Sequence, residues 1–236
     1  MDFDFLKIGR SKNCGVSDTF LLNDEIVQRT ESYVHSQLSD ESSGHDWWHI
    51  HRVWQTAKKL AEKENADQFI VQLAALLHDI ADWKFYNGNE DIGQQKARAW
   101  LEQLKVDEQT ISHVCQIIKD ISFKGAHVIT TMKSKEGMIV QDADRLDALG
   151  AIGIARAFAY GGHKGREMYN PSVKPELHIS FDQYKKKQSH TINHFYEKLL
   201  LLKERMNTEA AKTIAEERHK FMESYLKRFF EEWDGN

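Results

Sequence analysis

Two short segments place histidine and aspartate among apolar residues, where their chemistry needs an explanation. In DWWHIH, His49 lies one helical turn before Val53, on the apolar face of a helix expected from about residue 46 to 64. In LLHDI, His78 and Asp79 end a segment that is apolar nearly all round. A buried carboxylate is costly unless it is paired or bound to a cation, so Asp79 requires a positive partner. For His49 alone, a hydrogen-bonded core histidine is the alternative.

A third segment, VQDADRLDALG, holds Asp142, Asp144 and Asp147 among apolar residues. Asp144 lies one turn from both Val140 and Ala148, so its side chain can face the core. A structural alternative is an ion pair between Asp144 and Arg145. Adjacent helical residues point about 100° apart and do not face each other, which disfavours that pair.

In this order, the three segments resemble the H…HD…D pattern of HD-domain metal-dependent phosphohydrolases. The matching stretches are DWWHIHRVWQTAKKLA, LAALLHDIADW and QDADRLDALG. Taken residue by residue, the resemblance implies that His49, His78, Asp79 and Asp144 bind a divalent metal ion. More loosely, the stretches HFYEKLLLLKERMNTE and EERHKFMESYLKRFFEEWDG resemble a bacterial branch that includes nucleotide pyrophosphohydrolases.

The implied ligand set also indicates which metal would bind. Two imidazoles and two carboxylates balance a 2+ charge and leave octahedral positions open, which suits Mn²⁺ or Mg²⁺, with Fe²⁺, Co²⁺ and Ni²⁺ as alternatives. Structural zinc favours thiolates. Dinuclear relatives carry two further histidines where this sequence has SFKG, so we expect one metal ion. His51 lies about 200° around the helix from His49 and is expected at the surface.

Hydrolysis of a polyanion also requires a group that positions water and cations that neutralise phosphoryl oxygens. Asp82 shares a helix face with Asp79 and is the candidate for the water; its alternative role is a salt-bridging aspartate. The candidate substrate-binding residues are Lys84, Lys124, Arg145, Lys164, His194 and Lys198. His194 and Lys198 are four residues apart and so share one helix face. Solvated bystanders are expected among the lysines.

Helical periodicity predicts an all-α fold, an HD-domain helical bundle with a C-terminal helical hairpin. The expected helices cover about residues 23–38, 46–64, 67–81, 91–104, 107–121, 135–162, 180–206 and 208–233, with NTE at the hairpin turn. We expect an N-terminal extension over 1–22, the HD-domain core over 23–162, and a loop and C-terminal hairpin packed on the core over 163–236.

The composition of this 236-residue chain argues against some classes of binding partner. A net charge of -4 provides no basic field for nucleic acid. Cys14 and Cys115 are far apart and predict neither a disulfide framework nor a zinc ribbon, so reduced thiols in the cytoplasm fit best. Because there is no apolar run of membrane-spanning length, we expect no membrane association. The expected assembly is a monomer or homodimer.

The sequence therefore predicts a metal-dependent phosphohydrolase acting on a small phosphorylated substrate, most specifically a nucleoside triphosphate pyrophosphohydrolase. Such an enzyme releases a nucleoside monophosphate and pyrophosphate. The alternatives within the enzyme class are a nucleoside monophosphate phosphatase and a cyclic-nucleotide phosphodiesterase. The alternative of another class is a non-catalytic nucleotide or metal sensor, whereas a purely structural helical module is disfavoured by the buried acids.

Overall fold

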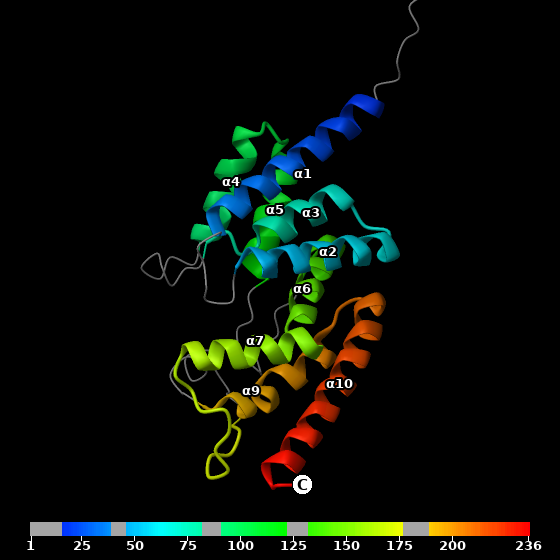
Figure 1. The fold of residues 1–236 in the computed structure, drawn as a ribbon. Helices are drawn as coiled ribbons and strands as arrows, with labels where there is room; N and C mark the ends of the chain where they lie inside the picture. The colour runs from blue at the N-terminus through cyan, green and yellow to red at the C-terminus, as the bar shows by residue number, and fades with distance from the viewer. Residues whose placement is uncertain (1–15, 39–45, 82–90, 122–131, 177–188) are drawn as a thin grey trace, which may run out of the picture.

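The computed structural model describes residues 16–38, 46–81, 91–121, 132–176 and 189–236, and every regular element in these ranges is a helix (Figure 1). In chain order they are α1 (Val16–Leu38), α2 (Trp47–Glu64), α3 (Gln68–Leu77), α4 (Ile92–Gln103), α5 (Glu108–Asp120), α6 (Lys135–Asp147), α7 (Gly150–His163), α9 (Thr191–Glu197), the 3-10 helix η2 (Leu199–Arg205) and α10 (Glu209–Trp233). The predicted all-α fold is confirmed. None of the described helices has both the length and the apolar character that a bilayer span requires.

Short polar side chains set where the central helices begin. The carboxylate of Asp46 accepts a hydrogen bond from the backbone N–H of His49, which fixes the first turn of α2. Asp67 caps α3 in the same way, and the hydroxyl of Ser134 caps α6. At its other end α2 stops at Asn65, which adopts the left-handed conformation with φ 52°. These caps fix where each helix begins and, for α2, where it ends.

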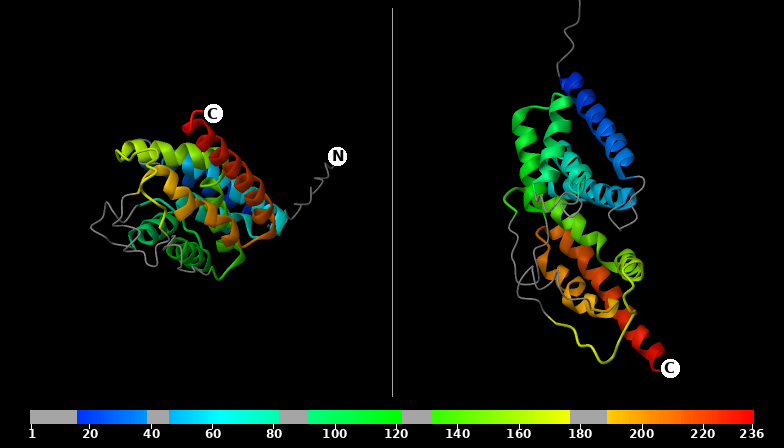
Figure 2. Two further views of the ribbon diagram at one scale, coloured as in Figure 1. Left: turned by 90° about the horizontal axis from the view of Figure 1, so that it is seen from below. Right: turned by 90° about the vertical axis from the view of Figure 1, so that its left-hand side faces the viewer.

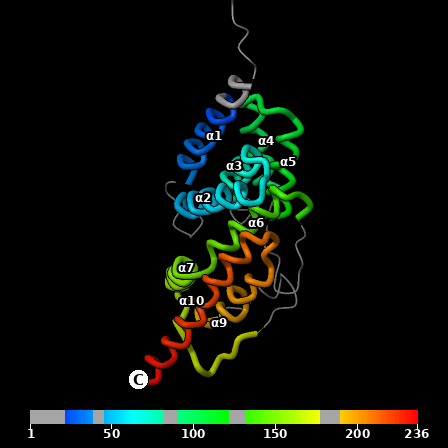
Figure 3. Tube along the Cα trace, turned by 90° about the vertical axis from the view of Figure 1, so that its right-hand side faces the viewer, coloured from blue at the N-terminus to red at the C-terminus, as the bar shows by residue number. Residues whose placement is uncertain are grey.

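The helices form two groups joined by α6 (Figure 1). Helices α1 to α5 gather at one end of the molecule, and α7, α9 and α10 at the other. The same elongated division is visible in the right-hand view of Figure 2 and in the tube of Figure 3, whereas the left-hand view of Figure 2 looks at the molecule from below. Helix α3 packs against α1, α2, α5 and α6, and its residues from Leu73 to Leu77 are fully buried. A helix that is apolar nearly all round is thus the centre of the core, as its sequence predicts.

The single helix expected over 135–162 is wrong, because the chain breaks between α6 and α7. Gly150 has φ +73°, a left-handed conformation that favours glycine. A Cβ at this position would also lie 3.1 Å from the side chain of Arg218 in α10. The break turns α7 away from α6, so that α7 packs against α9 and α10. The break between α6 and α7 comes directly after Asp147, the last residue of α6. It therefore lies beside the cluster of histidine and aspartate side chains described below.

The helix expected over 180–206 is also wrong in its described part. The ring of His190 accepts a hydrogen bond from the backbone N–H of Asn193 and starts α9 there. The following 3-10 helix, η2, places residues three apart on one face, which buries both Leu199 and Leu202. The hairpin turn does lie within NTE, where Thr208 caps α10.

Two helix ends differ from the sequence prediction. Helix α1 begins at Val16, not at residue 23, since Asn23 is a good cap but does not prevent helical turns before it. Helix α3 ends at Leu77, so His78 is its C-cap residue and not part of a helix continuing to residue 81. The proposed domain boundaries remain predictions.

Candidate metal centre

The two candidate histidine ligands are held through the same ring nitrogen. His49 Nδ1 lies 2.8 Å from Asp147 Oδ2, and His78 Nδ1 lies 2.8 Å from the carbonyl oxygen of Ala75. Both partners are acceptors, so each Nδ1 carries the proton and each Nε2 offers its lone pair. The Nε2 atom of His78 is buried and has no hydrogen-bond partner among the described residues. A buried imidazole nitrogen in this state is suited to binding a metal ion.

The two Nε2 atoms face the carboxylates of Asp79 and Asp144. His49 Nε2 lies 3.6 Å from Asp79 Oδ2 and 3.5 Å from Asp144 Oδ1. The corresponding distances from His78 Nε2 are 3.7 and 3.9 Å. Two donors that share an ion at about 2.1 Å each lie at most about 4 Å apart, so all four distances fit one shared ion. His49, His78 and Asp79 have ligand atoms that all lie within 4.8 Å of one another, and Asp144 joins this group through its approach to both histidines.

Three helices supply these side chains. Helix α2 provides His49, the C-terminal end of α3 provides His78 and Asp79, and α6 provides Asp144. Both histidines are buried, whereas the side chains of Asp79 and Asp144 are 31% and 37% exposed. One side of the cluster is therefore open to water and substrate. The C-terminal end of α3 also favours a cation, because the helix dipole is negative there.

Asp147 is a functional candidate that the sequence interpretation did not assign. It is 5% exposed and accepts hydrogen bonds from Arg52 Nε at 2.7 Å and Arg156 NH1 at 2.7 Å, besides its contact with His49. Burial alone would raise the pKa of Asp147, but the hydrogen bonds of His49 and Arg52 and the charge of Arg156 hold it well below its usual range. Burial lowers the pKa of His49, so its ring is neutral at neutral pH. Asp147 follows Asp144 by three residues, which was the available signal.

Two of the predicted substrate-binding residues lie apart from this cluster. Arg145 is buried and donates to the backbone carbonyl of Arg205, which connects α6 to η2. Lys164 follows the C-terminus of α7, whereas Asp147 precedes its N-terminus, and a helix of this length measures about 20 Å. Lys164 Nζ lies 5.7 Å from the ring of Tyr160. Three further predicted residues, Asp82, Lys84 and Lys124, lie outside the described residues.

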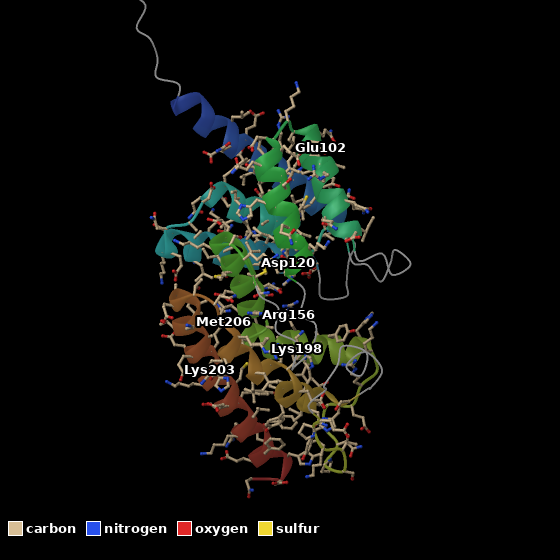
Figure 4. The ribbon with its side chains drawn as sticks, turned by 180° about the vertical axis from the view of Figure 1, so that it is seen from behind. Glu102, Asp120, Arg156, Lys198, Lys203 and Met206 are labelled. Carbon is tan, nitrogen blue, oxygen red and sulfur yellow. The ribbon has the colours of Figure 1, made fainter. Side chains whose placement is uncertain are left out.

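His194 and Lys198 both come from α9 and its C-cap, and α9 packs against α7. In the view of Figure 4, Lys198 lies just below Arg156, the residue that contacts Asp147. Burial, together with the charges of Lys198 and Arg166, lowers the pKa of His194 to about 3. A neutral His194 can donate a hydrogen bond to a phosphate oxygen but supplies no charge.

His51, which is predicted to lie at the surface, is partly exposed and packs against neighbouring aromatic side chains. Its ring lies among three tryptophans of α2, with centroids 5.8 Å from Trp47, 6.0 Å from Trp48 and 6.1 Å from Trp54. Residues three and four apart on a helix are neighbours, which explains this cluster. The exclusion of His51 from the ligand set remains a prediction.

Comparisons with known proteins identify a matching family, one similar protein sequence and two similar solved structures. The model of the HD domain family matches residues 47–149. The Bacillus subtilis protein YpgQ is 39% identical over 206 residues, which cover 86% of this chain and 91% of YpgQ. Its crystal structure in complex with ADP superposes with a TM-score of 0.71, over 89% of this chain and 96% of that one. The structure of an HD-superfamily hydrolase from Bacillus thuringiensis is 46% identical, with a TM-score of 0.72, and covers 91% of this chain and all of that one.

Proposed function

The chain belongs to the HD-domain superfamily of metal-dependent phosphohydrolases, and on that premise we propose that it cleaves nucleoside triphosphates between the α and β phosphates. The products are a nucleoside monophosphate and pyrophosphate. The observation that carries the proposal is that the half-exposed carboxylates of Asp79 and Asp144 each lie 3.5 to 3.9 Å from the Nε2 atoms of two buried histidines. This cluster is organised for a cation and open on the side where a phosphate can approach.

The residues present fit a divalent ion. The Nε2 atom of His78 is buried and has no hydrogen-bond partner among the described residues, and the two carboxylates carry the charge that a 2+ ion neutralises. In the proposal, His49, His78, Asp79 and Asp144 hold one Mn²⁺ or Mg²⁺, with Fe²⁺, Co²⁺ and Ni²⁺ as alternatives. When bound, the ion polarises a phosphoryl oxygen and lowers the pKa of water.

The protein's own groups bind and orient the substrate. The exposed edges of Asp79 and Asp144 define the face on which the α-phosphate meets the centre. In the proposal, Lys198 at the C-cap of α9 provides a point charge for the outer phosphates, and the neutral ring of His194 provides a hydrogen-bond donor. A role for Asp82 in positioning the attacking water remains a prediction.

A nucleotide substrate is supported by a relative of this chain. YpgQ has been crystallised in complex with ADP, and ADP contains a phosphoanhydride between its α and β phosphates. Cleavage of a triphosphate leaves two phosphates on the departing group, so a cation outside the metal centre is useful for this reaction. We assign this role to Lys198. A cytoplasmic location and a monomeric or homodimeric state remain predictions.

The test is a substrate panel with separate detection of the two phosphate products. Metal-stripped protein is restored with each divalent ion and incubated with nucleoside triphosphates, monophosphates and cyclic nucleotides. Pyrophosphate is expected from triphosphates, with activity restored best by Mn²⁺ or Mg²⁺. In ¹⁸O-water the label should enter the nucleoside monophosphate, because water attacks the α-phosphorus.

Other outcomes distinguish the alternatives. Faster release of orthophosphate from monophosphates would replace the proposal with a phosphatase, and turnover of cyclic nucleotides would indicate a phosphodiesterase. Nucleotide binding without turnover under any metal would indicate a sensor. The variant Asp144→Ala serves as the control for contaminating activity, because it removes a charged ligand of the proposed ion.

A further inference from the structure

We propose that Asp147 is a positioning residue, which together with Arg52 and Arg156 fixes the orientation and tautomer of His49. The role assigned to it is to keep the proton on Nδ1, so that Nε2 faces Asp79 and Asp144. This inference rests on the metal-binding part of the proposed function and is independent of the substrate.

The carboxylate of Asp147 is saturated with hydrogen-bond donors. Oδ2 lies 2.8 Å from His49 Nδ1, 3.0 Å from Arg52 NH2 and 2.7 Å from Arg156 NH1, while Oδ1 lies 2.7 Å from Arg52 Nε. An ionised carboxylate only accepts hydrogen bonds, and a neutral imidazole has one donor and one acceptor nitrogen. The proton of His49 must therefore reside on Nδ1.

Asp147 itself is held in place from two sides. Arg52 contacts both of its oxygens in the planar, two-pronged geometry that fixes a carboxylate, and it lies three residues after His49 on α2. Arg156 contacts it from α7. Rotation of the His49 ring would break its contact with a carboxylate that cannot follow. The frame thus joins α2, α6 and α7 around one ligand nitrogen.

His78 shows how differently a ligand can be oriented in the same centre. Its Nδ1 meets the carbonyl of Ala75, three residues earlier, so the short segment around the end of α3 is sufficient to set its tautomer. The partner of His49 is 98 residues away in the chain. Metal binding by His49 therefore depends on the docking of α6 and α7, whereas His78 needs only its own helix.

If Asp147 had a purely structural role, replacing it would change metal binding no more than replacing another buried carboxylate of α6. Asp142 provides this matched control. It is a carboxylate on the same helix and is fully buried. Its hydrogen bonds come from Asn207 and Thr208 at the start of α10, neither of which is a proposed ligand. Replacing Asp142 perturbs a buried carboxylate of α6 without changing the surroundings of His49.

The experiment compares Asp147→Ala with Asp142→Ala in metal-stripped, full-length protein labelled with ¹⁵N-histidine. Long-range ¹H–¹⁵N correlation reports the tautomer of His49, whose signal is assigned by its loss in His49→Gln. We expect the Nδ1–H form in the wild type and loss of that preference in Asp147→Ala. The dissociation constant for Mn²⁺ should rise by about 10- to 100-fold in Asp147→Ala. In Asp142→Ala both the signal and the dissociation constant should match the wild type.

Unchanged values in Asp147→Ala, or equal changes in Asp142→Ala, would overturn the inference. If Asp147→Ala does not fold, Asp147→Asn decides, because its amide oxygen still faces Nδ1 while the charge is lost. A rise of at least about threefold in the Mn²⁺ dissociation constant then supports the role, and an unchanged constant overturns it. The tautomer of His49 is measured in metal-free protein without substrate. This measurement therefore tests the role of Asp147 even if the protein is not a pyrophosphohydrolase.

Discussion

The carboxylates of Asp142 and Asp147 are both buried on α6, but their partners differ in kind. Asp142 accepts hydrogen bonds from the backbone and side chains of Asn207 and Thr208, all of them uncharged. Burial raises its pKa. Asp147 is surrounded by two guanidinium groups and the ring of His49, and its pKa is held below the usual range despite its burial.

This difference separates docking from ligand orientation within one helix. Asp142 satisfies the backbone N–H groups at the start of α10 and so joins α6 to the C-terminal group of helices. Asp147 has its charge compensated and directs one ring nitrogen of a proposed ligand. Asp144, between them, keeps a half-exposed carboxylate for the metal centre. The kind of partner thus predicts whether a substitution changes stability or metal binding.

The largest effect is expected at Asp144, the acid that lies between the other two. Asp144→Ala should abolish activity and metal binding, as should Asp79→Ala, because each removes a charged ligand. The free energy of unfolding of the metal-free protein should change little, since the side chain of Asp144 is 37% exposed. Metal content after desalting and initial rates measure this. His51→Ala, on the same helix as His49, is the control that should keep its metal.

Our ligand assignment fails if either aspartate variant retains its metal together with more than about a tenth of the wild-type rate.

At Asp142 the expected effect is on stability. Asp142→Ala should lower the free energy of unfolding by about 2–4 kcal/mol, because it leaves donors of Asn207 and Thr208 without their acceptor. Urea unfolding of the metal-free variant measures the change. Metal bound per folded chain should stay at the wild-type value. If Asp142→Ala weakened metal binding and left the free energy of unfolding unchanged, Asp142 would act on the metal centre and not on stability, which contradicts the account.

Lys198 tests the step from metal centre to substrate. Lys198→Ala should lower kcat/KM for triphosphates by about 10- to 100-fold, the effect of losing one charge-assisted phosphate contact, and leave metal content unchanged. Lys124→Ala is predicted to act in the same way. Lys203→Ala is the matched control, because Lys203 pairs with Glu216 of α10 at 3.1 Å. Equal rates in the Lys198 and Lys203 variants would remove Lys198 from the substrate site.

At neutral pH the smallest effect is expected at His194, which resembles Asp142 in that burial dominates its pKa. Its pKa falls from 6.5 to about 3 on folding, so below pH 6.5 the unfolded chain takes up a proton that the native protein does not bind. Stability is therefore lost as the pH falls from 6.5 towards 3, by up to about 1.4 kcal/mol per pH unit. His194→Gln should lose this part of the slope. Urea unfolding at a series of pH values measures it, and an unchanged slope would contradict the assignment.

The sequence indicated the four candidate ligands through local signals and through the resemblance to HD-domain proteins, and their binding of a metal ion stays a prediction. His49 lies on the apolar stripe of α2, His78 and Asp79 follow the apolar helix α3, and Asp144 lies on α6 with its side chain 37% exposed. These positions depend on helical periodicity, which short segments encode. The all-α class follows from the same periodicity.

Contacts between distant segments could not be predicted in this way. The partner of His49 is Asp147, 98 residues away, and nothing near either residue indicates the pair. The break before Gly150 depends on how closely Arg218 of α10 approaches, which is a property of the packed structure. Arg145 resembled a phosphate ligand by type, but the structure turns it to the carbonyl of Arg205. Residue type does not determine direction, which tertiary packing sets.

The central claim is that one divalent ion binds between His49, His78, Asp79 and Asp144, with His49 oriented by Asp147. Anomalous diffraction from crystals grown with Mn²⁺ tests it most directly. We predict a single strong anomalous peak per chain, contacted by Nε2 of both histidines and by an oxygen of each aspartate, with Nδ1 of His49 still on Asp147. A peak elsewhere, a second peak of equal height beside the first, or a ligand set lacking one of the four residues would contradict the account.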